Sequence, residues 1–299
     1  MINDLCKKEY AVALGCFDGL HTAHMAVINE AARLSSEGLL PAVMLFDEHP
    51  RNVIAENGIP CLLQKDKREA MLKNAGFHIF TVSFREIKDM SPEEFVRDVL
   101  VGSFHSGAVV CGYNYRFGKN GAGDSEKLIA LCKEYGIAVS VCPEFVLDGK
   151  SVSSTRIRKA VEEGRISDAN KMLGYEFTYS SEIFTGDRRG RLLGAPTINQ
   201  YLPEGLVIPR FGVYASKVNA DGKEYLGVTN IGSRPTFDGK SVRSETYIID
   251  YSGDLYGKTV TVSLFEFIRD EKKFPDADTL KMQISEDVKK TLLYFSDKN

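Results

Sequence analysis

Two histidines stand close together at the end of the stretch GCFDGLHTAH, residues 15–24. His21 and His24 are three positions apart, so both imidazoles share one side of a helix if its first turn begins here. A helix start carries unpaired N–H groups and partial positive charge, which suits a phosphate group. A phosphate site, a metal site, or a pair of loop histidines capping backbone groups are the interpretations open at this point.

The metal site is the weakest of the three. Structural zinc normally has four protein ligands, and His49, His78 and His105 are not at ligand spacing from the pair. The 6 cysteines are scattered singly and form no CxxC pair, so we expect reduced, mostly buried thiols.

Three further stretches combine residue types that suit anions and planar ligands. LFDEHP (45–50) follows an apolar run, and CGYNYRFGKNGAGD (111–124) joins glycines, aromatics and cations without the spacing of a dinucleotide-binding loop. A helix is predicted to start within SVSSTRIR (151–158), with hydroxyl side chains at its start and Arg156 and Arg158 in its first turns. These hydroxyls could equally be ordinary N-caps. Because arginine at a helix start opposes the helix dipole, we expect an anion nearby.

The elements that must position these stretches follow from the hydrophobic pattern of residues 10–141. Strands are predicted at YAVALGCF, LLPAVMLFD, FHIFTVSF, GAVVCG and IAVSVC, and helical patterns lie between them. One of these helices is predicted to have Ser91 as its N-cap and Pro92 in its first turn. Strict alternation is typical of a parallel sheet covered by helices on both faces. Ligands of such sheets bind at the carboxyl ends of the strands, where the stretches 15–24, 45–50 and 111–124 lie.

The pattern changes after about residue 177. The runs TYSSEIF, GVYASKV, KEYLGVTNI, SETYIIDY and KTVTVSLFEF are β-branched and aromatic, and turn-forming residues separate them. Such runs predict an antiparallel barrel or sandwich, followed by a last amphipathic helix in residues 276–295. We therefore expect two domains, residues 1–177 and 178–299.

Composition excludes several classes of protein. The 299 residues are 43% hydrophobic and 26% charged with a formal net charge of −3, so neither a nucleic-acid binder nor a membrane binder is indicated. No apolar run approaches the length of a membrane span, and the first ten residues do not resemble a secretory signal. A cytoplasmic enzyme that acts on small molecules is the expectation, and the oligomeric state is open.

The first half resembles the HxGH nucleotidyltransferase superfamily, in which an ISSTxxR-like stretch partners the two histidines. Here these are His21-Thr22-Ala23-His24 and Val152–Arg158, and with LFDEHP and YNYRFGKNGAGD they resemble the adenylyltransferase half of the bifunctional riboflavin kinase/FAD synthetase family. The resemblance implies an ATP and phosphate site at Gly15, Phe17, Asp18, His21, His24, Asn114, Ser154, Thr155 and Arg158, with His21 and His24 catalytic. Phe46 and Tyr115 are candidate flavin-stacking residues, and each could equally belong to the core.

The second half resembles the riboflavin kinase β-barrel of the same family. GDRRGRLLGAPTINQYLPEG (186–205) is similar to its G-x-P-T-x-N stretch, and GVTNIGSRPTFDG, SETYIIDYSGDLYGK and FIRDEKKF follow in the family's order. This resemblance gives Glu245 the role of general base, and it implies Mg²⁺ ligands at Thr197 and Asn199. The implied ATP and Mg²⁺ site comprises Gly190, Gly194, Pro196, Thr197 and Asn199.

The resemblance implies a bifunctional enzyme that converts riboflavin to FMN and then FMN to FAD, with ATP as co-substrate and Mg²⁺ as cofactor. The alternatives are a kinase whose first domain is a weak or inactive transferase that binds nucleotide or flavin, and a non-catalytic flavin carrier. Ala23 replaces the motif glycine, and it is harmless if the backbone is ordinary helix but obstructive if the nucleotide packs on it. We favour a working but weakened transferase site. The departures at Ala195 and Thr185 are peripheral.

Overall fold

The computed structural model describes residues 9–35, 38–54, 58–185, 197–236 and 239–297. By its internal contacts the chain divides into two compact units. The first consists of Met1–Ile59 with Lys65–Ser153, and the second of Pro60–Gln64 with Ser154–Asn299. This division puts residues 154–177 with the second unit, whereas the boundary near Phe177 for independently folding domains stays a prediction.

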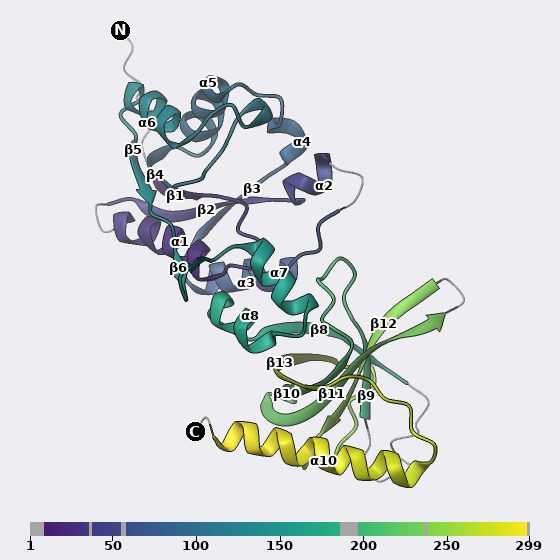
Figure 1. Ribbon diagram of the computed structural model, residues 1–299. Coiled ribbons are helices and arrows are strands. Elements are labelled where there is room, and N and C mark those ends of the chain that lie inside the picture. The colour runs from purple at the N-terminus through teal and green to yellow at the C-terminus, as the bar shows by residue number, and fades with distance from the viewer. Residues whose placement is uncertain (1–8, 36–37, 55–57, 186–196, 237–238, 298–299) are drawn as a thin grey trace. The chain divides into compact units, whose positions relative to one another are not determined.

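The first unit contains a parallel sheet of 5 strands in the order β3-β2-β1-β4-β5 (Figure 1). Its strands are β1 Tyr10–Leu14, β2 Leu40–Phe46, β3 His78–Val82, β4 Ser106–Gly112 and β5 Ala138–Cys142. The predicted parallel α/β architecture is confirmed. Strand order reverses between β1 and β4, which puts the topological switch point beside the stretch that carries the two histidines.

Helices connect these strands. They are α1 Thr22–Leu34, α2 Pro50–Ile54, α3 Lys65–Asn74, α4 Phe84–Ile87, α5 Pro92–Glu94, the π-helix Phe95–Ser103, a 3₁₀ turn at Lys119–Gly121 and α6 Ser125–Glu134. The predicted cap at Ser91 is confirmed: its side chain accepts from the Glu94 N–H, and the Glu94 carboxylate accepts from the Ser91 N–H. After this first turn the helix continues as a π-helix rather than the α-helix that the pattern suggested.

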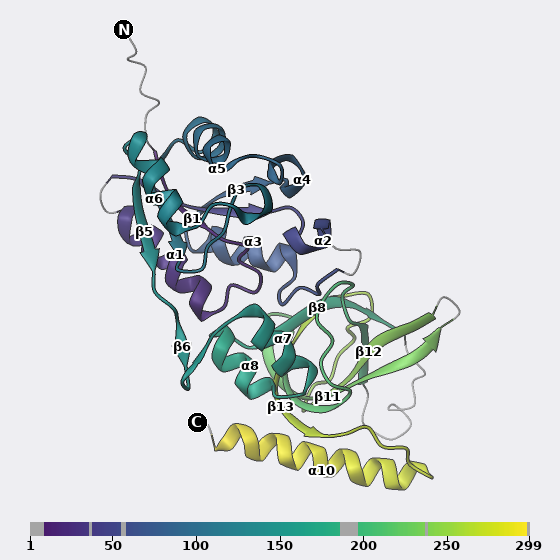
Figure 2. The same cartoon turned by 45° about the horizontal axis from the view of Figure 1, so that its top comes forward.

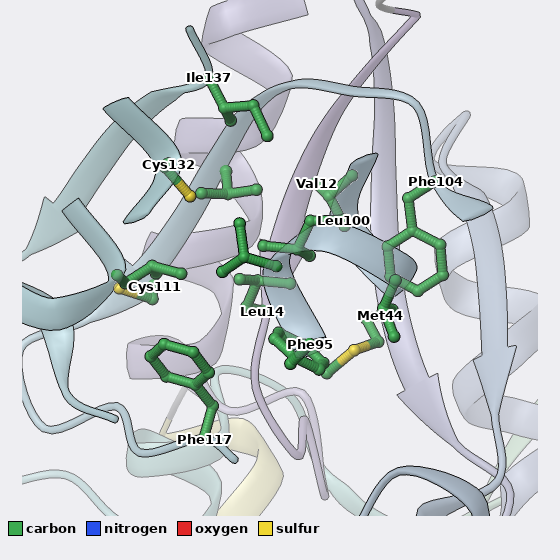
Figure 3. Packing of buried hydrophobic residues seen from close by; sticks show 14 of the residues in the cluster. Val12, Leu14, Met44, Phe95, Leu100, Phe104, Cys111, Phe117, Cys132 and Ile137 are labelled. Atoms are coloured by element: carbon green, nitrogen blue, oxygen red, sulfur yellow. The ribbon is translucent and has the colours of Figure 1, made fainter. Parts of the chain in front are cut away.

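Both faces of the sheet are covered. Figure 3 shows the cluster on one face, where Val12, Leu14 and Met44 pack with Phe95 of the π-helix and Cys132 of α6. On the other face, the alternating strand residues, such as Ala11, Ala13 and Val43, are also fully buried. Helix α1 packs across β1, β2 and β4. This double burial explains why the strands read as nearly continuous apolar runs.

The second unit is a closed antiparallel barrel in the order β10-β11-β12-β9-β8-β13, which confirms the predicted β-barrel with a terminal helix. Its strands are β8 Phe177–Phe184, β9 Thr197–Tyr201, β10 Gly212–Ala220, β11 Lys223–Thr236, β12 Gly239–Ile248 and β13 Thr259–Arg269. The short strands β6 Val146–Leu147 and β7 Lys150–Ser151 form a separate hairpin in the first unit.

The described residues of the second unit also form the helices α7 Ser154–Glu162, α8 Ile166–Leu173 and α10 Ala277–Ser296. α10 packs against β10, β11 and β13 (Figure 2). Its Asp287 is 1% exposed and receives three hydrogen bonds from the Arg269 guanidinium at 2.7–3.1 Å, so a buried ion pair links the helix to β13. Among the described residues, no helix is both long and apolar enough to span a membrane.

Candidate active sites

The histidine pair lies at the start of α1. His21 is the N-cap residue, with extended backbone, and its Nδ1 atom accepts from the His24 N–H at 3.2 Å. The two imidazole rings stack with centroids 3.5 Å apart and planes inclined by 16°. The helix therefore begins three residues earlier than its apolar run, and both imidazoles lie at its N-terminus, where the helix dipole is positive.

A tight turn delivers the chain from β1 to this helix. Phe17, Gly19 and Leu20 all have positive φ, at 46°, 79° and 39°. The Phe17 ring lies over Gly15, where a Cβ atom would be 3.0 Å from the ring, and it meets the His24 imidazole edge-on at 5.4 Å. Such conformations persist only where the surroundings enforce them, and they are common at ligand sites. The predicted residues Gly15, Phe17, Asp18, His21 and His24 are thus brought together in one turn.

Ala23 is the second residue of α1 and is not among the described residues with positive φ. The backbone there is ordinary helix, so glycine is not required for conformational reasons. Alanine in place of the motif glycine is compatible with the local structure.

The candidate flavin-stacking residues lie at the carboxyl ends of two other strands. Phe46, the last residue of β2, is 9% exposed and packs edge-on against Phe84 with centroids 5.5 Å apart. Tyr115, after β4, is half-buried and stacks on Phe117 at 5.8 Å. Both rings contribute to core packing, and a contact with flavin remains a prediction. Asn114 is exposed beside Tyr115.

Ser154, Thr155 and Arg158 occupy the first turns of α7, in the second unit. The predicted helix start is confirmed. Arg158 is 8% exposed, and its Nε atom donates to the carbonyl oxygen of Pro60 at 2.6 Å. This arginine therefore holds the segment 60–64 in addition to any role toward ATP.

The barrel brings Glu245 and Asn199 together. They are register partners in the antiparallel pair β12–β9, and Asn230 of β11 is the partner of Glu245 on its other side. Thr246, the next residue of β12, is buried in the barrel, where its hydroxyl bonds to that of Thr229 at 2.9 Å. Because side chains alternate along a strand, Glu245 projects from the opposite, outer face.

Thr197 belongs to the same group. It precedes Asn199 by two positions on β9, so the two side chains share one face of the strand, and its register partner is Tyr247. Asn199 is 9% exposed, and Glu245 is half-buried. Gly190, Gly194 and Pro196 of the predicted ATP site lie outside the described residues.

An aromatic and cationic group borders this face and was not predicted. The rings of Phe184 and Tyr201 stack with centroids 4.3 Å apart, and the Arg243 guanidinium lies over both, at 5.1 and 4.9 Å from the ring centroids. Arg243 and Tyr201 are register partners next to the Glu245–Asn199 pair. Strand register was the missing information, because a single sequence does not state which strands pair.

Family models match both units. A model described as FAD synthetase matches residues 4–156, and one described as riboflavin kinase matches residues 173–295. Among solved structures, a crystal structure described as a macrolide-efflux protein from Streptococcus pneumoniae aligns with a TM-score of 0.88 and 30% identity, covering 95% of this chain and 94% of that one.

Curated relatives extend the match over the whole chain. The bifunctional riboflavin kinase/FMN adenylyltransferase of Listeria monocytogenes is 35% identical over 95% of this chain and 92% of the relative. The protein of the same name from Bacillus subtilis is 31% identical over 98% and 96%. A nucleotidyltransferase unit joined to a kinase barrel defines a class of two-domain flavin-nucleotide enzymes. The chain belongs to the bifunctional riboflavin kinase/FMN adenylyltransferase family.

Proposed function

We propose that this chain phosphorylates riboflavin to FMN in its barrel unit and transfers AMP from ATP to FMN, giving FAD and pyrophosphate, in its first unit. Riboflavin, FMN, FAD and ATP are its substrates and products. The observation that carries this proposal is the register pairing of Glu245 with Asn199, beside Thr197, within a chain whose other unit holds the stacked His21–His24 pair.

In the kinase reaction the nucleophile is the neutral 5′-hydroxyl of riboflavin. We assign Glu245 to accept its proton as the hydroxyl oxygen bonds to the γ-phosphorus of ATP and the bond to ADP breaks. Glu245 is half-buried and projects from the outer face of the barrel, which is consistent with this role.

Mg²⁺ binding to the barrel is part of the proposal. Magnesium prefers oxygen ligands and keeps several waters, so one protein hydroxyl and one amide oxygen are a suitable partial ligand set. Thr197 and Asn199 supply these groups from one face of β9, which fits the ion. The ion would neutralise charge on the ATP phosphates.

In the adenylyl transfer the nucleophile is the phosphate of FMN, which is already anionic. No general base is required, and the site must orient two anions and stabilise the leaving pyrophosphate. We assign this stabilisation to His21 and His24, together with the positive end of the α1 helix dipole. Asn114, Ser154, Thr155 and Arg158 are proposed to contribute to ATP binding.

A kinase with a weak or inactive first domain is the alternative. This alternative depends on Ala23, which stands in place of the motif glycine. Because the backbone at Ala23 is helical, the loss of glycine does not by itself disturb the local conformation.

We also propose a cytoplasmic location, consistent with free thiols. The test is incubation of the full chain with riboflavin and Mg-ATP, followed by chromatography: FAD supports both activities, FMN alone supports the alternative, and unchanged riboflavin refutes the proposal.

A further inference from the structure

Arg68 is a cation at the carboxyl edge of the sheet that has no role in the site described so far. It lies in the first turn of α3, and its Nη2 atom donates to the carbonyl oxygen of Phe46, the last residue of β2, at 3.3 Å. Its Nε atom is buried and has no hydrogen-bond partner among the described residues. Arg68 is in none of the ion pairs found within the described part of the chain.

The Arg68 guanidinium is within electrostatic reach of the turn after β1. Arg68 and Arg51 both act electrostatically on the thiol of Cys16, in the turn after β1, and Asp18 acts on it in the opposite direction. Desolvation, with a further contribution from Asp18, raises the pKa of the Cys16 thiol to about 11, so this thiol stays neutral at physiological pH. The buried Nε–H donor of this half-buried guanidinium is unsatisfied within the described residues, and an anion that accepts from it would satisfy that donor.

The position of Arg68 indicates which anion it takes. The switch point lies between β1 and β4, and ATP is expected there. Arg68 is bonded to the end of β2, which is on the other side of β1 from β4. An in-line displacement at the α-phosphorus requires the nucleophile to approach from the side opposite the leaving pyrophosphate.

We propose that Arg68 binds the phosphate group of FMN and directs it toward the α-phosphorus of ATP. One phosphate oxygen of FMN forms the new bond to that phosphorus as the bond to pyrophosphate breaks, and no proton is transferred. A guanidinium suits this task because two of its N–H groups can hold two phosphate oxygens at once. The inference rests on the proposed FAD synthesis.

The test compares Arg68→Gln with Arg85→Gln in the full chain. Arg85 forms an exposed ion pair with Glu48 at 3.0 Å and is the matched loss of one arginine. For Arg68→Gln the KM for FMN at saturating ATP should rise roughly 10-fold to 100-fold, the loss typical of a charge-assisted hydrogen bond. In the same variant, the KM for ATP at saturating FMN should change by less than about 3-fold, and the rate of riboflavin phosphorylation should match wild type. In Arg85→Gln, the KM for FMN, the KM for ATP and the rate of riboflavin phosphorylation should all match wild type.

Arg68→Lys keeps the charge but loses the planar pair of donors, so its KM for FMN should lie between wild type and Arg68→Gln. The inference is overturned if a folded Arg68→Gln protein raises the KM for ATP instead, or changes neither KM. If Arg68→Gln does not fold by circular dichroism, an unchanged KM for FMN in Arg68→Lys overturns it. A wild-type chain that makes no FAD from FMN refutes the proposed function itself, which keeps the two failures apart.

Discussion

Glu245 on β12 lies directly opposite Asn199 on β9, although the two residues are far apart in the sequence. Opposite residues of an antiparallel pair have Cβ atoms about 4.5–5.5 Å apart, which is close enough for both side chains to contact one substrate. Asn230 extends the row on one side, and Phe184 of β8 extends it on the other. The barrel therefore assembles carboxylate, amide and aromatic groups from four strands in one row.

Replacement of the carboxylate tests its assigned role. Glu245→Gln keeps the size of the side chain but removes its basicity, so FMN formation from riboflavin should fall by roughly 10²-fold or more. Conversion of supplied FMN to FAD should be nearly unchanged. Glu224→Gln, which removes an exposed carboxylate paired with Lys217, is the control and should leave both rates intact. Equal damage to both reactions in a folded Glu245→Gln protein would show that the residue is not specific to the kinase.

The opposite pattern is expected at the histidine pair. His24→Ala removes an imidazole that stacks on His21, and loss of one group that stabilises the transition state typically lowers a rate by about 10²–10³-fold. FAD formation from FMN should fall by this factor, and FMN formation from riboflavin should not. His78→Ala, in β3, is the control histidine. Wild-type FAD synthesis in His24→Ala would remove this histidine from the site.

The buried ion pair between Arg269 and Asp287 gives a prediction on stability. Asp287→Asn leaves the Arg269 guanidinium, whose side chain is 13% exposed, without its carboxylate. Breaking a buried pair from one side typically costs about 3–5 kcal/mol. Urea unfolding should show a loss of this size, and the exposed neighbour variant Glu286→Gln should be within about 0.5 kcal/mol of wild type. A loss below about 1 kcal/mol for Asp287→Asn would mean that the pair does not anchor α10.

The substitution Ala23→Gly separates a helix effect from a ligand effect. Because Ala23 is in the first turn of α1, glycine should cost up to about 1 kcal/mol, which lowers Tm by roughly 2–4 °C. The helical backbone favours the interpretation in which alanine is already accommodated, so kcat/KM for FAD formation should stay within about 3-fold of wild type. A tenfold increase would instead show that the nucleotide packs against the methyl group.

Two fragments test the domain boundary. Asn170 of α8 donates to the Leu264 carbonyl at 2.8 Å and accepts from the Phe177 N–H at 2.8 Å, and α8 packs against β8 and β13. A fragment of residues 178–299 loses these contacts, whereas one of residues 154–299 retains them. Thermal unfolding should show a higher Tm for the longer fragment. Equal Tm values would favour the boundary near Phe177.

Much of the architecture was accessible from the sequence because its signals are local. The alternation of apolar strands with helices predicted the parallel sheet, and Ser91 with Pro92 predicted a helix start. The cluster in the turn after β1 was also predictable, since its residues are neighbours in the chain. The π-helix after Glu94 has no comparable local signal, since its composition is that of an ordinary buried helix.

Contacts between distant segments were not accessible. Arg68 is bonded to the end of β2 through the folding of α3 onto the sheet, and Arg243 lies over Phe184 and Tyr201 because of strand register. Nothing in the types or spacing of these residues distinguishes them from surface cations. The role of Glu245 came from family resemblance, and its proximity to Asn199 came from the barrel.

Complementation between two inactivated chains tests the central claim, that one chain carries two separate sites. With riboflavin and Mg-ATP, Glu245→Gln should leave riboflavin largely unchanged, and His24→Ala should stop at FMN. A mixture of the two variants should form FAD, because FMN released by one chain is a substrate for the other. If the mixture forms no FAD from riboflavin, although Glu245→Gln still converts supplied FMN to FAD, the account of two independent sites is contradicted.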